Sequence, residues 1–459
     1  MTLIKSISGI RGTIGGRAGE GLTPIDIVKF TAAFGKILIE KTGNNKFVVG
    51  RDARLSGAMV NNLVVGTLQS IGADVIDLGL STTPTVEIAV PLEGAAGGII
   101  LTASHNPGQW NALKLLNHEG EFISDVEGKE VLALGDSLDF DFAEVDRLGT
   151  VTKDDSYLQK HIEAVLALEY VDVEAVRRAN FKVAVDAVNS TGGIFIPALL
   201  EAMGVQTVYK IHCEPNGHFP HNPEPLKEHL TDLSAAVLEN GADLGIAVDP
   251  DVDRLVFMME NGELFGEEYT LVAVADYLLQ QQKGNTVSNL SSTRALRDVT
   301  HKHGGEYFAA AVGEVNVVTK MKEVDAVIGG EGNGGVIYPA SHYGRDALVG
   351  VAIFLTHLAK LGKKVSEYRA ELPQYYMSKN KIELTPGLDI DGLLSKMQEK
   401  YAHENHSTID GLKIDFENEW VHLRKSNTEP IIRIYSEGPT PEAAEAIAQK
   451  IMKDIADII

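Results

Sequence analysis

A pattern that occurs three times along the chain constrains the fold more than any other feature of the sequence. Each copy has a strand-like apolar stretch, a polar or glycine-containing turn, a helical stretch that ends near a glycine, and a second strand-like stretch. The copies begin with "FVVGRDARLSG" at residue 47, "FKVAVDAVNSTGG" at residue 181 and "NTVSNLSSTRALRDVTHKHGG" at residue 285. Alternating strands and helices favour sheets that helices cover on both faces. The recurrence predicts three related α/β domains.

The C-terminal part of the sequence follows a different pattern. "WVHLRKSNTEPIIRIYSE", residues 420–437, predicts two strands around a polar loop, and a helix follows. Thr440 is placed to cap this helix, and Pro441 takes its first position, where the missing N–H has no cost. We therefore expect three similar mixed α/β domains and a smaller C-terminal α+β domain. Their predicted limits are 1–152, 153–253, 254–366 and 367–459.

Composition restricts the partners of such a chain. With 41 Lys and Arg against 64 Asp and Glu, the formal net charge is −23, which disfavours nucleic acids and membranes as partners. An anionic ligand must therefore bind in a local cationic pocket. The N-terminus has no apolar core of signal-peptide length, and no apolar run is long enough to span a bilayer. The single cysteine, Cys213, excludes an internal disulfide and a cysteine-based zinc site, so we expect a soluble cytoplasmic protein.

The first loop that can carry chemistry is "TASHNP", residues 102–107. Asn106 and Pro107 enforce a turn directly after an apolar stretch, so the hydroxyl of Ser104 is expected to project from a loop. Ser104 is then either a backbone cap or a nucleophile and phosphate carrier. Lys114, ten residues later, is either solvated or an acid, base or phosphate ligand of the same space.

The second loop is "DPDVDR", residues 249–254, which follows an apolar strand-like stretch. Asp249, Asp251 and Asp253 lie so close in sequence that they repel one another unless a cation compensates. Carboxylate oxygens suit Mg²⁺ or Ca²⁺, although an acidic solvated turn is the alternative. The glycine and late glutamate of an EF-hand are absent. Arg254 adds a cation that suits a phosphate.

Two further loops carry polar groups that suit a sugar phosphate. In "GEGNGG", residues 330–335, the glycines let a ligand approach the backbone, and Glu331 and Asn333 suit sugar hydroxyls. A flexible loop is the alternative there. "RKSNTEP", residues 424–430, offers a guanidinium, hydroxyls, an amide and loop N–H groups to a phosphate, or is a plain polar hairpin loop. Its candidate phosphate ligands are Arg424, Ser426, Asn427 and Thr428, with Arg433 one strand later.

Together the four loops resemble those of the α-D-phosphohexomutase superfamily, and they occur in the order found there. "TASHNP" resembles its phosphoserine loop, "DPDVDR" its metal loop, "GEGNGG" its sugar loop and "RKSNTEP" its phosphate-binding loop. Shorter matches ("SGIRG", "VGRDAR", "VDAVNSTGG", "FPHNPEP" and "GRDAL") extend the resemblance over nearly the whole chain. The resemblance implies four domains around a central cleft.

The resemblance also implies roles for the residues of these loops. Ser104 would carry a phosphoryl group, and one Mg²⁺ per chain would join it to Asp249, Asp251 and Asp253. Lys114 would shuttle a proton to the sugar hydroxyl, Arg254 would assist, and His105 and Arg11 would complete the pocket.

The implied substrate is a hexose monophosphate, which passes through a sugar 1,6-bisphosphate that also primes the enzyme. Arg424, Ser426, Asn427 and Thr428 would hold the remote phosphate, while Glu331 and Asn333 would hold hydroxyls of the sugar. The loop "GEGNGG" lacks the Ser-Gly-His ending of the best-known phosphomannomutases/phosphoglucomutases and of bacterial phosphoglucosamine mutases. It looks most like the loop of the phosphoglucosamine mutases typical of archaea and of some bacterial lineages. The resemblance therefore implies interconversion of glucosamine 6-phosphate and glucosamine 1-phosphate by a monomer or homodimer.

Three alternatives stay open at this point. Phosphomannomutase or phosphoglucomutase activity is the nearest one. A Mg²⁺-dependent phosphatase could use an aspartate of "DPDVD" as its nucleophile and Ser104 only as a structural residue. A non-catalytic sugar-phosphate-binding protein could have the same loops without turnover.

Overall fold

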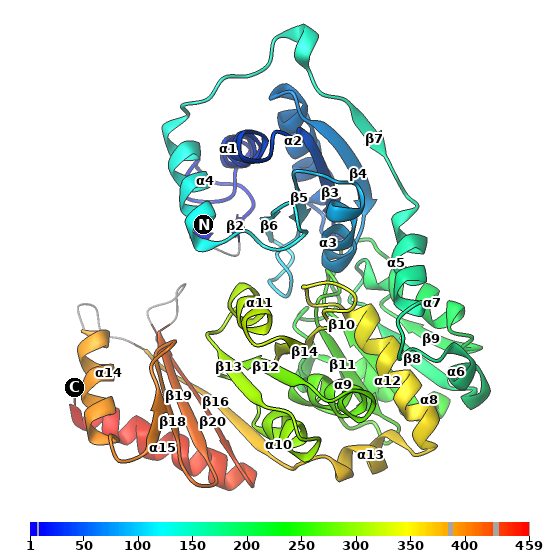
Figure 1. The fold of residues 1–459 in the computed structure, drawn as a ribbon, viewed down its shortest axis with the longest axis vertical. Coiled ribbons are helices and arrows are strands. Elements are labelled where there is room, and N and C mark those ends of the chain that lie inside the picture. The colour runs from blue at the N-terminus through cyan, green and yellow to red at the C-terminus, as the bar shows by residue number, and fades with distance from the viewer. Residues whose placement is uncertain (7–8, 384–388, 426–430, 459) are drawn as a thin grey trace.

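The computed structural model describes residues 1–6, 9–383, 389–425 and 431–458, which form four sheets with their helices. Figure 1 shows the first domain at the top, the second and third domains side by side below it, and the C-terminal domain at the lower left. The predicted fold class, three similar mixed α/β domains and a smaller α+β domain, is confirmed.

The first domain contains a seven-stranded sheet in the order β1-β2-β6-β5-β3-β4-β7. Its first helix shows why these boundaries form: Thr23 caps it reciprocally with Asp26, Pro24 is its first residue, and Gly43 ends it in the left-handed conformation. The strands are β1 Leu3–Ser6, β2 Gly9–Thr13, β3 Lys46–Arg51, β4 Asp74–Leu80, β5 Gly97–Leu101, β6 Trp110–Leu116 and β7 Val151–Lys153; the helices are α1 Pro24–Thr42, α2 Gly57–Ser70, α3 Thr83–Leu92, α4 Asp125–Ser137 and the 3₁₀ turn η1 Val145–Arg147.

The second domain has a four-stranded sheet in the order β11-β10-β8-β9. Its edge strand, β11, pairs with β10. The sheet of the second domain therefore extends beyond residue 253. The strands are β8 Lys182–Asp186, β9 Thr207–Ile211, β10 Leu244–Val248 and β11 Leu255–Met259; the helices are α5 Tyr157–Leu166, α6 Val173–Ala179, α7 Gly192–Ala202, α8 Thr231–Asn240 and the 3₁₀ turn η2 Lys227–His229.

The third domain repeats this arrangement with a sheet in the order β13-β12-β14-β15. Its strands are β12 Asn285–Asn289, β13 Tyr307–Ala310, β14 Ala326–Glu331 and β15 Gly335–Ile337; its helices are α9 Glu267–Gln281, α10 Ala295–Lys302, α11 Glu314–Glu323, α12 Ala347–Leu361 and α13 Val365–Glu371. Helices α9 and α12 pack into one hydrophobic core with the second domain. There the ring of Phe354 stacks on Phe257 with centroids 3.8 Å apart.

The C-terminal domain is a five-stranded antiparallel sheet in the order β16-β20-β19-β18-β17 with two helices on one face. The predicted helix after residue 440 is confirmed, because Thr440 Oγ1 accepts a hydrogen bond from the Ala443 N–H at 3.1 Å. The elements are β16 Tyr376–Glu383, α14 Ile390–Lys400, β17 Asn405–Ser407, β18 Leu412–Asp415, β19 Trp420–Lys425, β20 Ile431–Gly438 and α15 Pro441–Ile458.

One four-stranded unit is common to the first three sheets. It has three parallel strands followed by an antiparallel strand at the edge of the unit, as β4-β3-β5-β6, β9-β8-β10-β11 and β13-β12-β14-β15. In the first sheet this strand, β6, also pairs with β2. The structural repeat thus matches the threefold pattern in the sequence. Among the described helices, none is long and apolar enough to cross a membrane.

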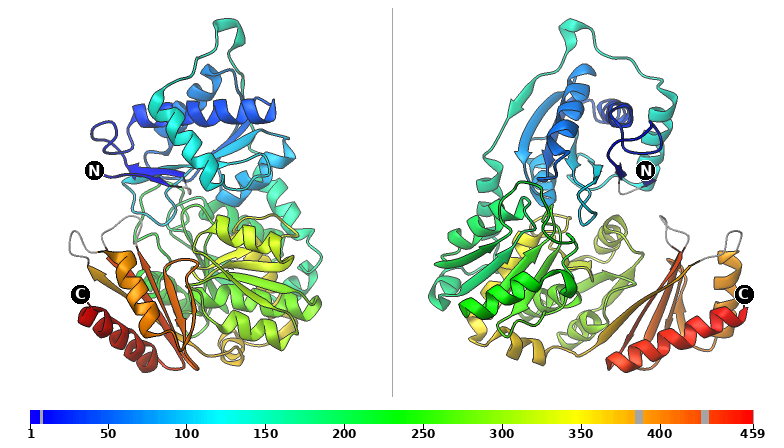
Figure 2. Two further views of the ribbon diagram at one scale, coloured as in Figure 1. Left: turned by 60° about the vertical axis from the view of Figure 1, so that its left-hand side comes forward. Right: turned by 180° about the vertical axis from the view of Figure 1, so that it is seen from behind.

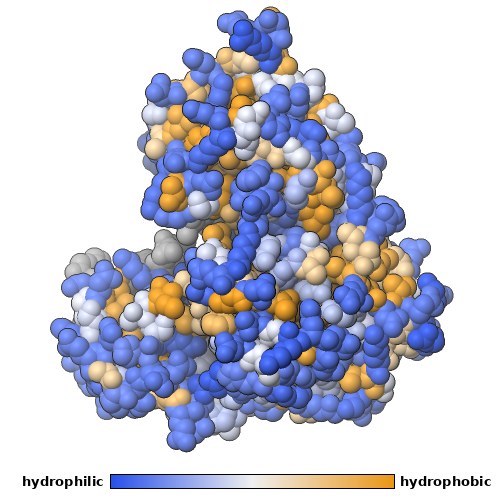
Figure 3. Space-filling view, in the orientation of Figure 1, coloured by the Kyte–Doolittle hydropathy of each residue, from blue (hydrophilic) through white to orange (hydrophobic). Residues whose placement is uncertain are grey.

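The domains leave a hollow between the first and the C-terminal domain. Figure 2 shows the C-terminal sheet standing apart from the first domain in both views. The space-filling view in Figure 3 shows the same hollow as an indentation of the molecular surface. The strands β19 and β20 rise toward this indentation from below (Figure 1).

Candidate active site

Three candidate loops occupy the same position in the three repeated units. The segments 102–109, 249–254 and 332–334 each connect the third strand of a unit to its antiparallel edge strand. Each turn contains a residue with a positive φ: Ser104 at +49°, Val252 at +65° and Gly334 at +89°. Left-handed backbone is costly for serine and more so for valine, and such strain is typical of functional sites.

Ser104 and the aspartates, which lie far apart in sequence, are in direct contact. Ser104 is only 3% exposed, and its Oγ donates a hydrogen bond to Asp249 Oδ2 at 2.7 Å. Its backbone N–H donates to Thr102 Oγ1 at 2.9 Å. The hydroxyl of the first turn therefore points at the carboxylates of the second.

A buried arginine that the sequence analysis left without a role holds the turn around Ser104. Arg54 pairs with Asp52 at 2.9 Å, and its remaining guanidinium N–H groups donate to backbone carbonyls of the turn. These acceptors are the carbonyls of Ser104, of Asn106 at 2.7 Å, of Pro107 at 2.8 Å and of Trp110 at 3.1 Å. The fork geometry of a guanidinium fixes several acceptors at once, so Arg54 is a positioning residue for Ser104.

The three aspartates form a buried cluster that suits a cation. One carboxylate oxygen from each of Asp249, Asp251 and Asp253 lies within 4.8 Å of the others. Burial, and then repulsion from the other two, raises the pKa of Asp249 well above its usual range. Within the described residues, Asp251 Oδ1 and Asp253 Oδ1 are buried without a hydrogen-bond partner. Orphaned carboxylate oxygens in an all-oxygen donor set fit a hard divalent ion such as Mg²⁺.

The opposite oxygens of the same carboxylates face cations and a hydroxyl of the protein. Lys114 Nζ lies 2.6 Å from Asp251 Oδ2 and 3.0 Å from Asp253 Oδ2, and Thr83 Oγ1 donates to Asp251 Oδ2 at 2.5 Å. Burial alone would lower the pKa of Lys114, but the two carboxylates outweigh burial and raise it. The lysine is therefore an ammonium in this arrangement.

Arg345 joins the cluster to the sugar loop. It donates to Asp253 Oδ2 at 2.8 Å, to Glu331 Oε2 at 2.9 Å and to Glu314 Oε2 at 2.9 Å. Burial would raise the pKa of Asp253, but Arg345 and then Lys114 hold it below its usual range. Burial outweighs Arg345 at Glu314, whose pKa rises to about 7. Arg345 lies in the sequence motif "GRDAL". The motif alone predicts no role for this arginine, because the partners of Arg345 lie on other segments.

The remaining candidates of the first two loops also lie at this site. His105 Nδ1 is 3.4 Å from Ser104 Oγ, and Arg11 donates to Asn106 Oδ1 at 2.8 Å. Burial, and then the cations Arg254 and Arg11, lower the pKa of His105 well below its usual range, so its ring is neutral. Arg254 pairs with Glu224 at 3.2 Å.

In the sugar loop, the side chains of Glu331 and Asn333 are hydrogen-bonded to each other. Asn333 Nδ2 donates to Glu331 Oε2 at 3.4 Å, while Asn333 Oδ1 accepts from the Gly335 N–H at 3.2 Å. Glu331 Oε1 accepts from Asn289 Nδ2 at 2.9 Å. Both side chains are thus fixed at the end of β14, next to Arg345.

The phosphate-binding candidates lie on the C-terminal domain. Arg424 on β19 faces Arg433 on β20 in the strand register, and Arg424 Nε donates to Asp410 Oδ2 at 2.7 Å. The same carboxylate oxygen accepts the Val312 N–H of the third domain at 3.1 Å. The other three candidates, Ser426, Asn427 and Thr428, lie outside the described residues.

Fold and site together define a class: a four-domain α/β protein with a buried serine, a carboxylate cluster and a sugar-binding turn on equivalent connections. Family models confirm this class. They match phosphoglucomutase/phosphomannomutase alpha/beta/alpha domains I, II and III and the C-terminal domain at residues 3–141, 157–262, 266–376 and 380–454, respectively. The chain therefore belongs to the phosphoglucomutase/phosphomannomutase family of phosphohexomutase enzymes, and the predicted superfamily is confirmed.

Relatives named phosphoglucomutase/phosphomannomutase and relatives named for amino-sugar phosphates both align with nearly the whole chain. A phosphoglucomutase/phosphomannomutase of Thermococcus kodakarensis is 38% identical over 94% of this chain and 95% of that protein. A phosphoglucosamine/phosphogalactosamine mutase of Sulfurisphaera tokodaii is 31% identical over 97% of each. The crystal structure of a phosphoglucomutase/phosphomannomutase family protein from Burkholderia thailandensis, 25% identical, superposes with a TM-score of 0.85 over 99% of this chain and 97% of that one.

Proposed function

We propose that this enzyme interconverts glucosamine 6-phosphate and glucosamine 1-phosphate, with Ser104 as the phosphoryl carrier. The observation that carries the proposal is the contact of 2.7 Å between Ser104 Oγ and Asp249 Oδ2. It places the buried hydroxyl of Ser104, in the first turn, against the carboxylate cluster of the second. A structural serine cap requires no such cluster, whereas phosphoryl transfer requires a compensated anionic centre.

Each group then has a task in transfer from phosphoserine to sugar. The attacking sugar hydroxyl forms the new P–O bond as the bond between phosphorus and Ser104 Oγ breaks. The proton of that hydroxyl ends on the serine oxygen, and Lys114, an ammonium beside both acids, is the proposed shuttle. The neutral His105 and Arg11 border the same serine turn.

The carboxylates of Asp249, Asp251 and Asp253, together with the oxygen on Ser104, would hold Mg²⁺. When bound, this ion stabilises the negative charge of the phosphoryl oxygens. Arg345 keeps Asp253 and Glu331 in fixed positions relative to each other, so the acids and the sugar-binding turn act as one surface.

The remaining phosphate of the substrate must bind far from Ser104, and it must do so in both orientations of a sugar 1,6-bisphosphate. Arg424 and Arg433 on adjacent strands are the proposed cationic clamp, with Ser426, Asn427 and Thr428 beside them. Glu331 and Asn333 would bind the middle of the sugar, whose position changes least when the bisphosphate turns around.

Two features support glucosamine as the sugar. The sugar loop "GEGNGG" resembles that of archaeal phosphoglucosamine mutases, and its carboxylate Glu331 suits the ammonium of an amino sugar. Relatives of this chain include one named for glucosamine and galactosamine phosphates. Phosphoglucomutase or phosphomannomutase activity is the second candidate, because another relative has that name.

Intact mass spectrometry tests the carrier. The purified enzyme should gain one phosphoryl group on incubation with a hexose 1,6-bisphosphate, the group should map to Ser104, and Ser104→Ala should lose both the adduct and at least about 99.9% of kcat. Ser395→Ala, at an exposed serine of α14, is the control and should keep both. Net release of phosphate by active Ser104→Ala would instead identify a phosphatase, and no turnover of any hexose phosphate after priming would identify a binding protein.

A coupled assay with the phosphates of glucosamine, glucose and mannose tests the substrate. We expect kcat/KM to be highest with glucosamine 1-phosphate and glucosamine 6-phosphate. A higher value with mannose or glucose phosphates would replace the proposed substrate and leave the role of Ser104 in place.

A further inference from the structure

A second cluster of metal-ligating side chains lies in the second domain, outside the carboxylate cluster of the active site. Asp186 ends β8, His212 directly follows β9, and His221 lies on the segment after it. One ligand atom from each lies within 4.8 Å of the others. Strands β8 and β9 are parallel neighbours, with Asp186 opposite Ile211, so their carboxyl ends bring these side chains together.

The hydrogen bonds of His221 orient one ring nitrogen toward a cation. Its Nδ1 lies 2.8 Å from the carbonyl oxygen of Asn222. A carbonyl only accepts, so Nδ1 carries the proton. Nε2 faces both oxygens of Asp186 at 3.3 and 3.2 Å. If the ring of His221 were neutral, the lone pair of Nε2 would point at the negative carboxylate of Asp186 and the two would repel each other. A proton or a metal ion is therefore needed between Nε2 and this carboxylate.

The same bonding pattern is common among metal ligands. A histidine that binds a metal through one nitrogen usually donates its other N–H to a carbonyl or carboxylate, which fixes the tautomer. Asp186 is buried, and its carboxylate supplies the negative charge that a cation here would meet.

His212 is held in a costly conformation beside this pair. Its φ is +48°, and its ring centroid lies 5.6 Å from that of His221. Its Nε2 is 2.9 Å from Asp232 Oδ2 on α8. The side chains of His212 and His221 are 23% and 16% exposed and that of Asp232 is 65% exposed. The cluster therefore has a rigid inner side and an open outer side for entry of an ion and water.

We propose that Asp186, His212 and His221 bind a divalent transition metal, for which Zn²⁺ is the probe, with Asp232 or water as the fourth ligand. Two imidazoles and a carboxylate suit such an ion, whereas the all-oxygen active-site cluster suits Mg²⁺. Tetrahedral ligands about 2.0–2.1 Å from Zn²⁺ are about 3.3 Å apart. The separation of His221 Nε2 from the two Asp186 oxygens, 3.3 and 3.2 Å, matches that edge, and a ring nitrogen of His212 lies within 4.8 Å of a ligand atom of each.

Cys213, next to His212, is not a ligand of this site. Its Sγ contacts the carbonyl oxygens of Ile211 and Val185 at 3.3 and 3.5 Å. Both contacts turn the sulfur toward backbone carbonyl groups, so the donor set is imidazole and carboxylate.

The ion would stabilise a segment that supports the active site. Between and after the two histidines, the ring of Phe219 packs on the guanidinium of Arg54 at 5.1 Å, and Glu224 pairs with Arg254 at 3.2 Å. A bound ion would join this segment to the end of β8. The role is structural, and it is expected as higher thermal stability of the folded protein with the metal.

Isothermal titration calorimetry tests the site on the full chain in saturating Mg²⁺, after removal of trace metals by a chelator. We expect one Zn²⁺ per chain, a rise in Tm with Zn²⁺, and visible absorption of a bound Co²⁺ that is typical of nitrogen and oxygen ligands. His221→Gln should lower Zn²⁺ affinity at least about tenfold, in line with the loss of a ligand. Circular dichroism checks that the variant is folded.

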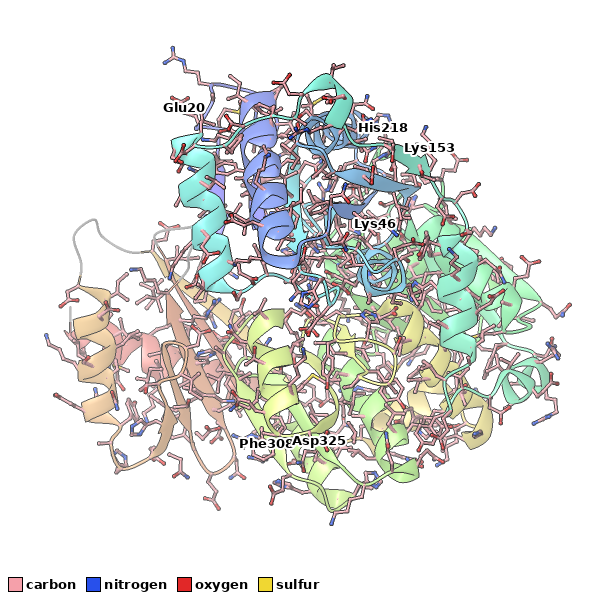
Figure 4. The ribbon with its side chains drawn as sticks, turned by 45° about the horizontal axis from the view of Figure 1, so that its top comes forward. Glu20, Lys46, Lys153, His218, Phe308 and Asp325 are labelled. Carbon is pink, nitrogen blue, oxygen red and sulfur yellow. The ribbon has the colours of Figure 1, made fainter. Side chains whose placement is uncertain are left out.

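Matched variants separate this site from its neighbours. His218→Gln, at the exposed histidine labelled in Figure 4 on the same segment, should bind Zn²⁺ like the unmodified chain. Asp251→Asn and Cys213→Ser should keep the site as well. No Zn²⁺ binding by the unmodified chain, equal binding by His221→Gln, or loss of binding in Asp251→Asn would each overturn the proposal. None of these results alters the role of Ser104.

Discussion

At the scale of single residues, the site depends on how a strained serine is held in place. Ser104 has a positive φ, and the two terminal nitrogens of Arg54 donate four hydrogen bonds to backbone carbonyls around its turn. A lysine would keep the charge but could not reach the same set of carbonyl oxygens. The turn is therefore expected to lose its conformation before the domain loses its fold.

We expect Arg54→Lys to lower kcat by about 10–100-fold with a smaller change in KM, because misplacing the carrier affects the transferring group more than substrate binding. Steady-state kinetics measure both, and the rate of Ser104 phosphorylation by a bisphosphate should fall in parallel. Arg51→Lys is the control, since Arg51 donates one hydrogen bond to the Asp52 carbonyl. Equal kcat values for the two variants would contradict a positioning role for Arg54.

Glu268 provides a residue-scale prediction that depends on pH. Burial raises its pKa to about 8, against the lowering effect of Lys379. Because the folded pKa is the higher one, this group stabilises the folded state fully below the unfolded pKa, and the contribution is lost as pH rises through about 8. Replacing it with glutamine removes that dependence.

The free energy of unfolding of Glu268→Gln, relative to the unmodified chain, should therefore increase from about pH 5 to about pH 9 by a few kcal/mol. Urea unfolding at several pH values measures it. Glu442→Gln, at the exposed start of α15, should show no such trend. If the free energy of unfolding of Glu268→Gln, relative to the unmodified chain, decreased with rising pH, a raised pKa of Glu268 would be contradicted.

The residue types at the centre of the site were predictable, and most of their supporting residues were not. Ser104 and the three aspartates stand in short motifs whose chemistry is visible locally. Arg345 acts through Asp253, which is 92 positions away, and Arg54 acts through carbonyls on another turn. Contacts of this kind depend on tertiary structure, so neither spacing nor periodicity could identify them.

At the scale of elements, the third-to-fourth-strand turn is the feature that the repeats share. Gly334 fits its turn because a side chain there would meet backbone: a Cβ would lie 2.4 Å from the Leu255 carbonyl oxygen. The Leu255 N–H also donates to the Gly334 carbonyl at 3.0 Å. The turn proposed to bind the sugar thus rests directly on the first residue of β11, next to the turn proposed to bind the metal.

We expect Gly334→Ala to raise KM for hexose phosphates by about tenfold and to destabilise the fold by about 1–3 kcal/mol, from the positive φ and the clash together. Kinetics and urea unfolding measure the two effects. Gly362→Ala is matched to it, because Gly362 has a φ of +62° and open space around its Cβ. An equal KM for the two variants would mean that the turn is not part of the substrate site.

The alternation of strands and helices in the sequence predicted the elements of the repeated units. The strands and helices of the second and third domains follow a clear alternation, and the predicted units form there. The first sheet adds β1, β2 and β7, which lie outside the repeated four-stranded unit. No recurring pattern marks them in the sequence, so only pairing within the folded sheet defines them.

At the scale of the whole molecule, the proposed phosphate clamp belongs to the C-terminal domain and the proposed phosphoryl carrier to the first domain, and the hollow of Figure 3 lies between these two domains. Asp410 holds Arg424 and also accepts the Val312 N–H, so the clamp arginine is tied to the third domain. A substrate phosphate would compete with Asp410 for this guanidinium.

Because Arg424 binds a part of the substrate that does not react, Arg424→Ala should raise KM by about tenfold or more and change kcat less. The measurement is the same coupled assay with saturating bisphosphate. Arg297→Ala, at a half-exposed arginine that pairs with its neighbour Asp298, serves for comparison. Unaltered KM in Arg424→Ala would remove β19 from the substrate site.

The shared position of the three turns has a consequence for the history of the protein. Triplication of one ancestral gene segment would give three copies of the same strand order, each ending in the same left-handed corner. Divergence could then assign a different chemical task to each corner without altering the scaffold that aims it. With the proposed function, the cost is that no copy can work alone, since nucleophile, counter-charge and specificity would reside in separate descendants of one unit.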